Sequence, residues 1–272
     1  METLKYVVHY LILMRASFIA VLVIVVLVVA ALVYLLINQE IQEAPRIALS
    51  NAKELVLTEN FTGTYYMIVT TQINSRTSTS SSISTTSRSP SINALVSNGT
   101  GLLTESNGEV VRINTTEATW VQGNEVCQVL ILISNASLYN RTTTFCIPSN
   151  YSRYLLPFYT DEELLGNATY VGEGSWNGET TYCFRSEITM SEPSITTTAG
   201  RTTIGSPITL IINATRICLL SNGVITSATV YEIGQLSNHQ SFVTIINETL
   251  ISYSFTFNQQ LFNQITSKAG PS

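Results

Sequence analysis

Hydrophobic residues follow different patterns in different parts of this chain, and the first pattern is an unbroken run. From Ala16 to Ile37 there is no charged side chain. A helix of about 22 residues, at ~1.5 Å per residue, is long enough to cross the ~30 Å hydrocarbon core of a bilayer. The pattern predicts a transmembrane helix over residues 16–38, which acts as a signal anchor because no cleavage site follows it.

Positive charges near this run predict its orientation. Lys5 and Arg15 precede the run, whereas Arg46 and Lys53 lie farther away on the other side. Positive residues favour the cytoplasmic side. We therefore expect residues 1–15 to be a short cytoplasmic segment and the bulk of the chain to be extracellular.

After the run, apolar residues recur at helical spacing for a short distance. Ile47, Leu49, Leu55 and Val56 fit one face of a helix. This spacing predicts an amphipathic juxtamembrane helix over residues 39–58.

From Phe61 onward the apolar residues alternate with polar ones, which is typical of half-buried β-strands. Turn signals separate the alternating segments, and they lie at Asn107-Gly108, Gly123-Asn124, Asn177-Gly178 and Ser221-Asn222-Gly223. The pattern predicts a mainly β domain over residues 59–272, with an antiparallel sheet that is either curved or sandwich-like.

Two short helices are expected to interrupt this domain. Thr160 to Glu163 fits a capping box, with Gly166 as the stop, and the tail NQQLFNQITSKA is a second candidate. Residues 72–91, which lie between the first strand and these helices, are dominated by serine and threonine. Because this tract has little apolar surface to offset the entropy of ordering, it is expected to be a mobile loop.

Four cysteines in an exported segment indicate two disulfides, with three possible pairings. If the segments around them form hairpins, Cys127 lies opposite Cys146 and Cys183 lies opposite Cys218. The spacing therefore favours two locally closed hairpins over four buried free thiols. A metal site is disfavoured because there is no CxxC motif and no nearby histidine.

Acceptor triplets for N-glycosylation are spread over the whole segment after the apolar run. They begin at Asn60, Asn98, Asn114, Asn135, Asn140, Asn150, Asn167, Asn213 and Asn247. Their number and spread predict an extracellular glycoprotein that carries N-linked glycans.

Composition narrows the function classes. Charged residues make up only 11% of the chain and the formal net charge is -5, so no basic patch for nucleic acid is expected. Asp161 is the only aspartate, and His239 is the only histidine after the apolar run. With no nucleophile motif beside them, we expect no enzyme activity, no catalytic residues and no cofactor.

The anchor, the charge-poor exterior, the dense triplets and the two local cysteine pairs together resemble membrane-anchored surface glycoproteins of thermoacidophilic archaea. More locally, TYVGEGSWNGETTYCF (169–184) and ICLLSNGVITSATVY (217–231) are similar to strands of curved-sheet (LolA/LppX-like) lipoprotein carriers. That second resemblance implies a bent sheet around an apolar cavity for lipid.

Three functions follow as expectations. The first is a structural or accessory subunit of the cell envelope or of a membrane complex, with the bilayer and other envelope or membrane proteins as partners. The second is a pilin-like filament subunit, since Arg15-Ala16 before the apolar run resembles a pilin leader cleavage position. The third is a protein that binds lipid or another apolar ligand on a curved β-sheet.

Overall fold

The structure, a computed structural model, describes residues 28–29, 33, 43–105, 107–135, 140–149, 159–198, 201–235 and 240–267. The chain divides into two compact units, Met1–Arg46 and Ile47–Ser272. The segment predicted to span a membrane, residues 16–38, and the predicted cytoplasmic segment lie almost wholly outside the described residues. Within the described ranges, no helix has the length and apolar character needed to cross a bilayer.

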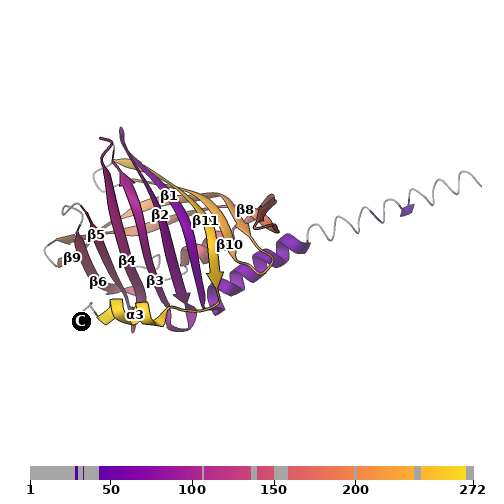
Figure 1. Ribbon diagram of the computed structural model, residues 1–272, viewed down its shortest axis with the longest axis horizontal. Coiled ribbons are helices and arrows are strands. Elements are labelled where there is room, and N and C mark those ends of the chain that lie inside the picture. Colours follow the sequence, from indigo (N-terminus) through magenta and orange to yellow (C-terminus); the bar gives the residue numbers. More distant parts are fainter. Residues whose placement is uncertain are drawn as a thin grey trace, which may run out of the picture. The chain divides into compact units, whose positions relative to one another are not determined.

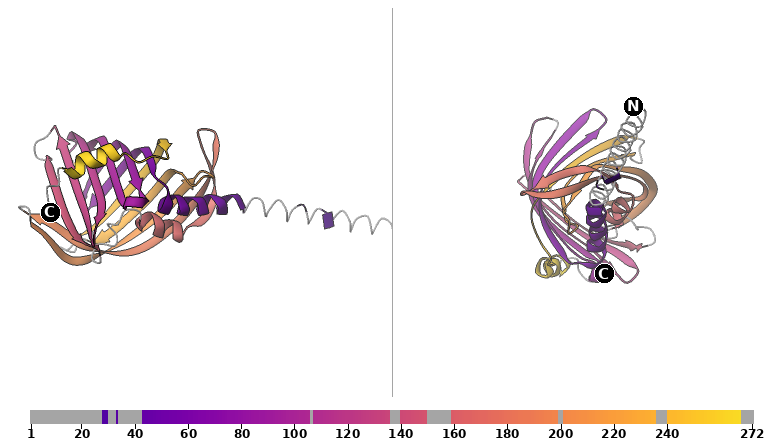
Figure 2. Two further views of the ribbon diagram at one scale, coloured as in Figure 1. Left: turned by 90° about the horizontal axis from the view of Figure 1, so that it is seen from below. Right: turned by 90° about the vertical axis from the view of Figure 1, so that its right-hand side faces the viewer.

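The second unit is built on one antiparallel sheet of 11 strands in the order β6-β5-β4-β3-β2-β1-β11-β10-β9-β8-β7. The sheet is strongly curved (Figures 1 and 2). Its strands are β1 (Phe61–Ile73), β2 (Arg76–Ser89), β3 (Ala94–Thr104), β4 (Val110–Gln122), β5 (Glu125–Ser134), β6 (Arg141–Pro148), β7 (Thr169–Trp176), β8 (Glu179–Thr198), β9 (Arg201–Leu219), β10 (Ile225–Gln235) and β11 (Ser241–Ser254). The mainly β prediction is confirmed, and the sheet is curved rather than a sandwich.

The strand order reflects two simple meanders. Strands β1 to β6 follow one another toward one edge, and strands β7 to β11 follow one another back to β1 from the other edge. The connection from β6 to β7 joins the two edges of the sheet, and it contains helix α2 (Tyr159–Gly166). Helix α2 therefore lies in the segment that crosses from one edge of the sheet to the other.

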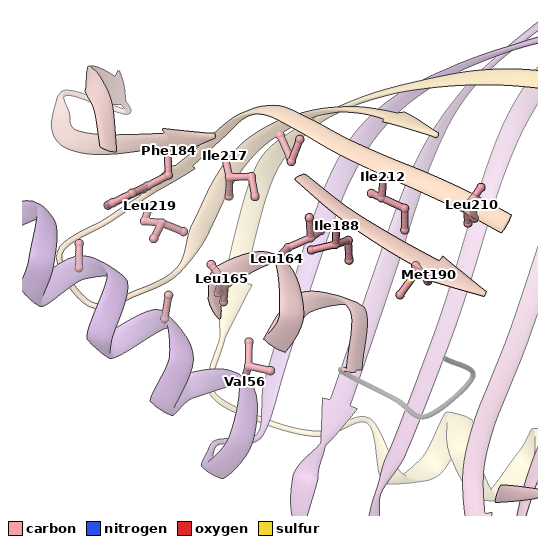
Figure 3. Close-up of a cluster of buried hydrophobic side chains, with 14 residues drawn as sticks. Val56, Leu164, Leu165, Phe184, Ile188, Met190, Leu210, Ile212, Ile217 and Leu219 are labelled. Atoms are coloured by element: carbon pink, nitrogen blue, oxygen red, sulfur yellow. The ribbon is translucent and has the colours of Figure 1, made fainter. Parts of the chain in front are cut away.

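Side chains on one face of the sheet form the main hydrophobic core, and we call this face the concave face. Phe184, Ile188, Ile212 and Ile217 from β8 and β9 point toward α2 and toward the helix that ends at residue 58 (Figure 3). The cross-strand pairs Ile188↔Ile212 and Phe184↔Ile217 explain why these residues share a face. The two helices therefore cover the concave face of β8 and β9.

Residues 43–58 form a helix within the range 39–58 predicted for an amphipathic helix, but its buried stripe differs in part from the prediction. The buried residues are Ala48, Ala52, Leu55 and Val56, whereas Ile47 is 49% exposed. Alanines let the helix backbone approach the turns of the sheet closely, which a stripe of large side chains would prevent.

The opposite, convex face carries a smaller core. Helix α3 (Gln259–Thr266) packs Ile265 against Val96, Ala118 and Val129 from β3, β4 and β5. Figure 2 shows α3 outside the curve of the sheet. The two short helices predicted from the sequence are both present.

The predicted mobile loop over residues 72–91 is wrong. Residues 76–89 form strand β2, which is hydrogen-bonded to β1 on one side and β3 on the other. Hydroxyl pairs such as Thr62–Ser87 at 2.7 Å and Thr64–Thr85 at 3.0 Å link neighbouring strands. Pairing on both sides satisfies the backbone of this tract, so it does not need an apolar sequence to be ordered.

The predicted hairpins and disulfides are confirmed. Cys127 pairs with Cys146 across β5 and β6, and Cys183 pairs with Cys218 across β8 and β9. The Asn-Gly turn at residues 177–178 has positive φ at both positions, 50° and 85°, as the sequence predicted.

Candidate functional site on the concave face

The concave face of the sheet continues beyond the main core onto strands that no described helix covers. The side chains there are apolar and half-buried: Met67, Val69 and Ile73 on β1, Leu103 on β3, Ile113 on β4, Leu130 and Leu132 on β5, and Ile246 on β11. Cross-strand pairs such as Val69↔Ile246 and Leu103↔Val111 place these residues on one surface. This surface, which we call the concave wall, is the candidate site.

The middle of the concave wall is built from small residues. Ser80, Ser82 and Ser84 of β2 face the same side as Met67, and Gly99 and Gly101 of β3 lie opposite Ser84 and Ser82. A methyl group at position 101 would meet the backbone carbonyl oxygen of Ser81 at 2.5 Å. Small side chains leave space between the apolar residues on either side, so the wall has a shallow, hydroxyl-lined floor.

One end of this wall opens into a cavity of about 650 Å³. Its lining includes Thr71, Ile73, Arg76, Ser78 and Leu103 near the β1–β2 turn. The volume falls within the range of ~300–1,000 Å³ that is usual for small-molecule sites. Two apolar side chains, Ile73 and Leu103, stand beside hydroxyl, amide and charged groups in this lining, so the cavity suits a ligand with both polar and apolar surface.

The other end of the wall holds a charged cluster. Arg88 of β2 forms an ion pair with Asp161 of α2, with 3.5 Å between Nη1 and Oδ2. The Arg88 guanidinium carbon lies 5.0 Å from the centre of the Phe61 ring, a cation–π geometry. This ion pair ties α2 to a strand far from β8 in the sheet order, so it helps to hold the curve.

Burial changes the pKa values of the residues in this cluster. Burial, together with the smaller effect of the neighbouring Asp161 carboxylate, raises the pKa of Glu248 to about 7. Burial also raises the pKa of Asp161, while Arg88 opposes this change. The Asp161 side chain is 45% exposed, so water offsets part of its desolvation. Tyr65 has a raised pKa, chiefly because it is buried and also because Glu248 lies nearby.

Charged side chains of both signs reach the concave face among its described residues. Glu117, Glu232 and Glu248 face inward on β4, β10 and β11, and Asp161 approaches from α2. Arg88, Arg76 and Arg141 bring positive charge to the same face. Glu117 accepts a hydrogen bond from Gln128 Nε2 at 2.6 Å.

The predicted site residues lie elsewhere. Both disulfides lie within hairpins and away from this wall. Of the glycosylation asparagines, Asn60, Asn98, Asn114, Asn135, Asn140, Asn167 and Asn247 are exposed, Asn213 is half-buried, and Asn150 lies outside the described residues.

No metal site emerges from the described ranges. Among them, the one group of three metal-ligand side chains close enough to share an ion is Glu125, Cys127 and Cys146, and its two sulfurs are joined in a disulfide. His239, the histidine that follows the apolar run in the sequence, lies outside the described residues.

Sequence reasoning missed most of the charged cluster. Arg88 falls in the tract that was expected to be a mobile loop, and Glu248 falls inside a glycosylation triplet. In the sequence, Asp161 stands out only as the sole aspartate and as part of the predicted capping box. Its rarity was a usable signal, because a single carboxylate of one type in a charge-poor chain stands out from the rest.

No protein-family model and no curated protein matches the chain. Solved structures that match over most of the chain include a β-barrel-like protein of the domain of unknown function DUF1849 from Brucella abortus, with 9% identity, coverage of 74% of this chain and 99% of that chain, and a TM-score of 0.29. Another is a DUF1329 family protein from Desulfovibrio piger, with 10% identity, coverage of 80% and 93%, and a TM-score of 0.27.

Proposed function

We propose that the concave wall binds a small apolar or amphiphilic molecule. The observation that carries this proposal is the row of half-buried apolar side chains around a serine and glycine floor, open at one end through a cavity of about 650 Å³. A ligand that covers half-buried apolar side chains removes them from water, and this stabilises the complex by ~25 cal/mol per Å² of apolar surface covered.

The proposal includes a location. The apolar run over residues 16–38 and the spread of acceptor triplets support a single-pass, membrane-anchored, extracellular glycoprotein with a cytoplasmic N-terminus. A protein held beside a bilayer is well placed to take up or present a membrane-derived amphiphile. Other envelope or membrane proteins are its proposed partners, and nucleic acid is not one.

Ligand binding is tested by placing a bulky side chain on the floor of the concave wall. Ser82 faces the concave side opposite Met67 and Gly101, whereas its neighbour Ser81 faces the convex side opposite Ile68. We expect Ser82→Phe to weaken binding of the neutral fluorescent probe N-phenyl-1-naphthylamine by roughly tenfold or more, because overpacking costs about 1–3 kcal/mol.

The matched control is Ser81→Phe, which puts the same side chain on the same strand but on the other face. We expect it to bind the probe like the unmodified protein, and thermal melting checks that both variants fold. Unchanged binding in Ser82→Phe, or no binding by the unmodified protein, would show that the concave wall is not the site. Extraction of the native protein with organic solvent, followed by mass spectrometry, identifies the natural ligand.

A further inference from the structure

Acceptor asparagines that lie on strands share one face of the sheet. Asn213 lies between Ile212 and Ala214, which both point into the main core, so Asn213 points to the convex side. Asn247 likewise lies between the concave residues Ile246 and Glu248. Asn98 on β3 and Asn114 on β4 also point to the convex side, because Asn98 shares its face with Val96, which contacts α3.

Two of the triplets, separated by more than 40 residues in sequence, meet in one hollow. A cavity of about 550 Å³ is lined by Asn167 and Thr169 of one triplet and by Asn213 and Thr215 of the other. Arg185 and Glu187 of β8 complete the described rim between them. The strand pairs Thr169↔Arg185 and Glu187↔Asn213 explain this meeting, because β8 lies between β7 and β9.

The lining of this hollow consists of groups that bind sugar hydroxyls. Amide, hydroxyl, carboxylate and guanidinium groups supply both donors and acceptors. Asn213 Nδ2 donates a hydrogen bond to Glu187 Oε2 at 3.1 Å, and Asn167 Nδ2 donates to the Glu163 carbonyl oxygen at 2.9 Å. A glycosylated asparagine keeps one N–H on Nδ2, so each of these hydrogen bonds is compatible with an attached sugar.

We propose that Asn167 and Asn213 are glycosylated and that the hollow between them binds the first sugars of these glycans. The inference rests on the proposed export of the chain, and it adds a binding site for the glycan on the convex face. Arg185 and Glu187 are the residues that contact the sugar. Asn247 is an exposed acceptor asparagine on β11 and lines neither of the two described cavities.

The experiment uses the full-length chain, purified from a host that N-glycosylates exported proteins. Glycopeptide mass spectrometry first measures occupancy at each acceptor asparagine. The folded protein is then treated with peptide N-glycosidase over a time course. We expect release at Asn167 and Asn213 to be about fivefold or more slower than release at Asn247, because one or two hydrogen bonds of about 1 kcal/mol each hold the sugar.

A substitution distinguishes a glycan that is bound in the hollow from one that the glycosidase only reaches slowly. Arg185→Ala should speed release at Asn167 and Asn213 toward the rate at Asn247. The matched control is Arg112→Ala, which removes an exposed arginine from β4, and it should change none of the three rates. After denaturation all sites should be released equally.

The possible failures are distinguishable. If every acceptor asparagine is bare, the proposed export is overturned. If other sites are occupied while Asn167 and Asn213 are bare, export stands and this inference is overturned. If both are occupied but are released as fast as Asn247, or if Arg185→Ala leaves the rates unchanged, the proposed sugar-binding hollow is overturned.

Discussion

Glu248 shows how the curve of the sheet changes the chemistry of a single residue. In the sequence it is the middle residue of an Asn-x-Thr triplet. Its neighbours Asn247 and Thr249 face the convex surface. In the fold it points the other way, toward Asp161 and Tyr65, and burial raises its pKa to about 7. A glutamate that would be ionised in an open strand is therefore half-protonated near neutral pH.

This shift predicts a pH dependence of stability. The ordinary pKa of the group is 4.5 and its folded pKa is about 7, so between these values the folded chain holds a proton that the unfolded chain has lost. The contribution of Glu248 to the free energy of unfolding is complete below pH 4.5 and falls as the pH rises to 7, by up to about 3 kcal/mol.

Glu248→Gln should remove this dependence, because glutamine does not titrate. Thermal melting between pH 4.5 and 8 should show that the variant is more stable than the unmodified protein at pH 8 and that the difference shrinks at low pH. Glu173→Gln changes an exposed glutamate on β7 and serves as the control. A difference between Glu248→Gln and the unmodified protein that does not vary with pH would contradict the shift.

At the scale of elements, one turn and one helix depend on each other. Gly223 closes the β9–β10 turn with a φ of 87°, and a methyl group added there would collide with the backbone of Asn51 and Ala52. Asn51 also donates a hydrogen bond to the Ser221 carbonyl oxygen at 2.8 Å. The turn was predictable from Ser221-Asn222-Gly223, but its contact with a helix 170 residues earlier was not.

A pair of glycine substitutions separates the backbone effect from the packing effect. Gly178 has a similar φ of 85°, but its added methyl group would meet no atom within 4 Å. We expect Gly178→Ala to cost about 1–2 kcal/mol through backbone strain alone. Gly223→Ala should cost roughly 1–3 kcal/mol more, because it also displaces the helix. Urea unfolding measures both values, and equal losses would show that the helix does not pack closely on this turn.

Strand β2 shows the limit of sequence patterns for elements. Its serines and threonines offer no apolar alternation, so the tract resembles a mobile loop when it is considered alone. Pairing with β1 and β3 gives its backbone groups partners along both sides. Because that pairing is contributed by other strands, no pattern within residues 76–89 could have revealed it.

For the molecule as a whole, the two disulfides lie on opposite arms of the curved sheet. Cys127–Cys146 joins β5 to β6 near one edge, and Cys183–Cys218 joins β8 to β9 near the other. The connection that holds α2 runs between these two edges. The arms are thus stabilised separately, while α2 and the Arg88–Asp161 ion pair hold them in one curved body.

Removing either disulfide should destabilise the second unit by a similar amount. The paired cysteines are separated by 19 and 35 residues, and loop-closure entropy gives about 3 and about 4 kcal/mol for loops of these lengths. Double Cys→Ser variants of each pair, compared by thermal melting, check these values. An unchanged melting temperature in either double variant would show that its disulfide does not stabilise the native fold.

The sequence by itself determined the local features of this protein. Alternation of apolar and polar residues identified β-strands, Asn-Gly pairs identified turns, and cysteine spacing identified both disulfides, because each of these signals depends on residues that are neighbours along the chain or across one hairpin. The tertiary structure alone decided that β2 is a strand, that Arg88, Asp161, Tyr65 and Glu248 form one cluster, and that two glycosylation triplets share a hollow. These features depend on which strands pair and how far the sheet curves, and both are set by contacts between segments that are distant in sequence.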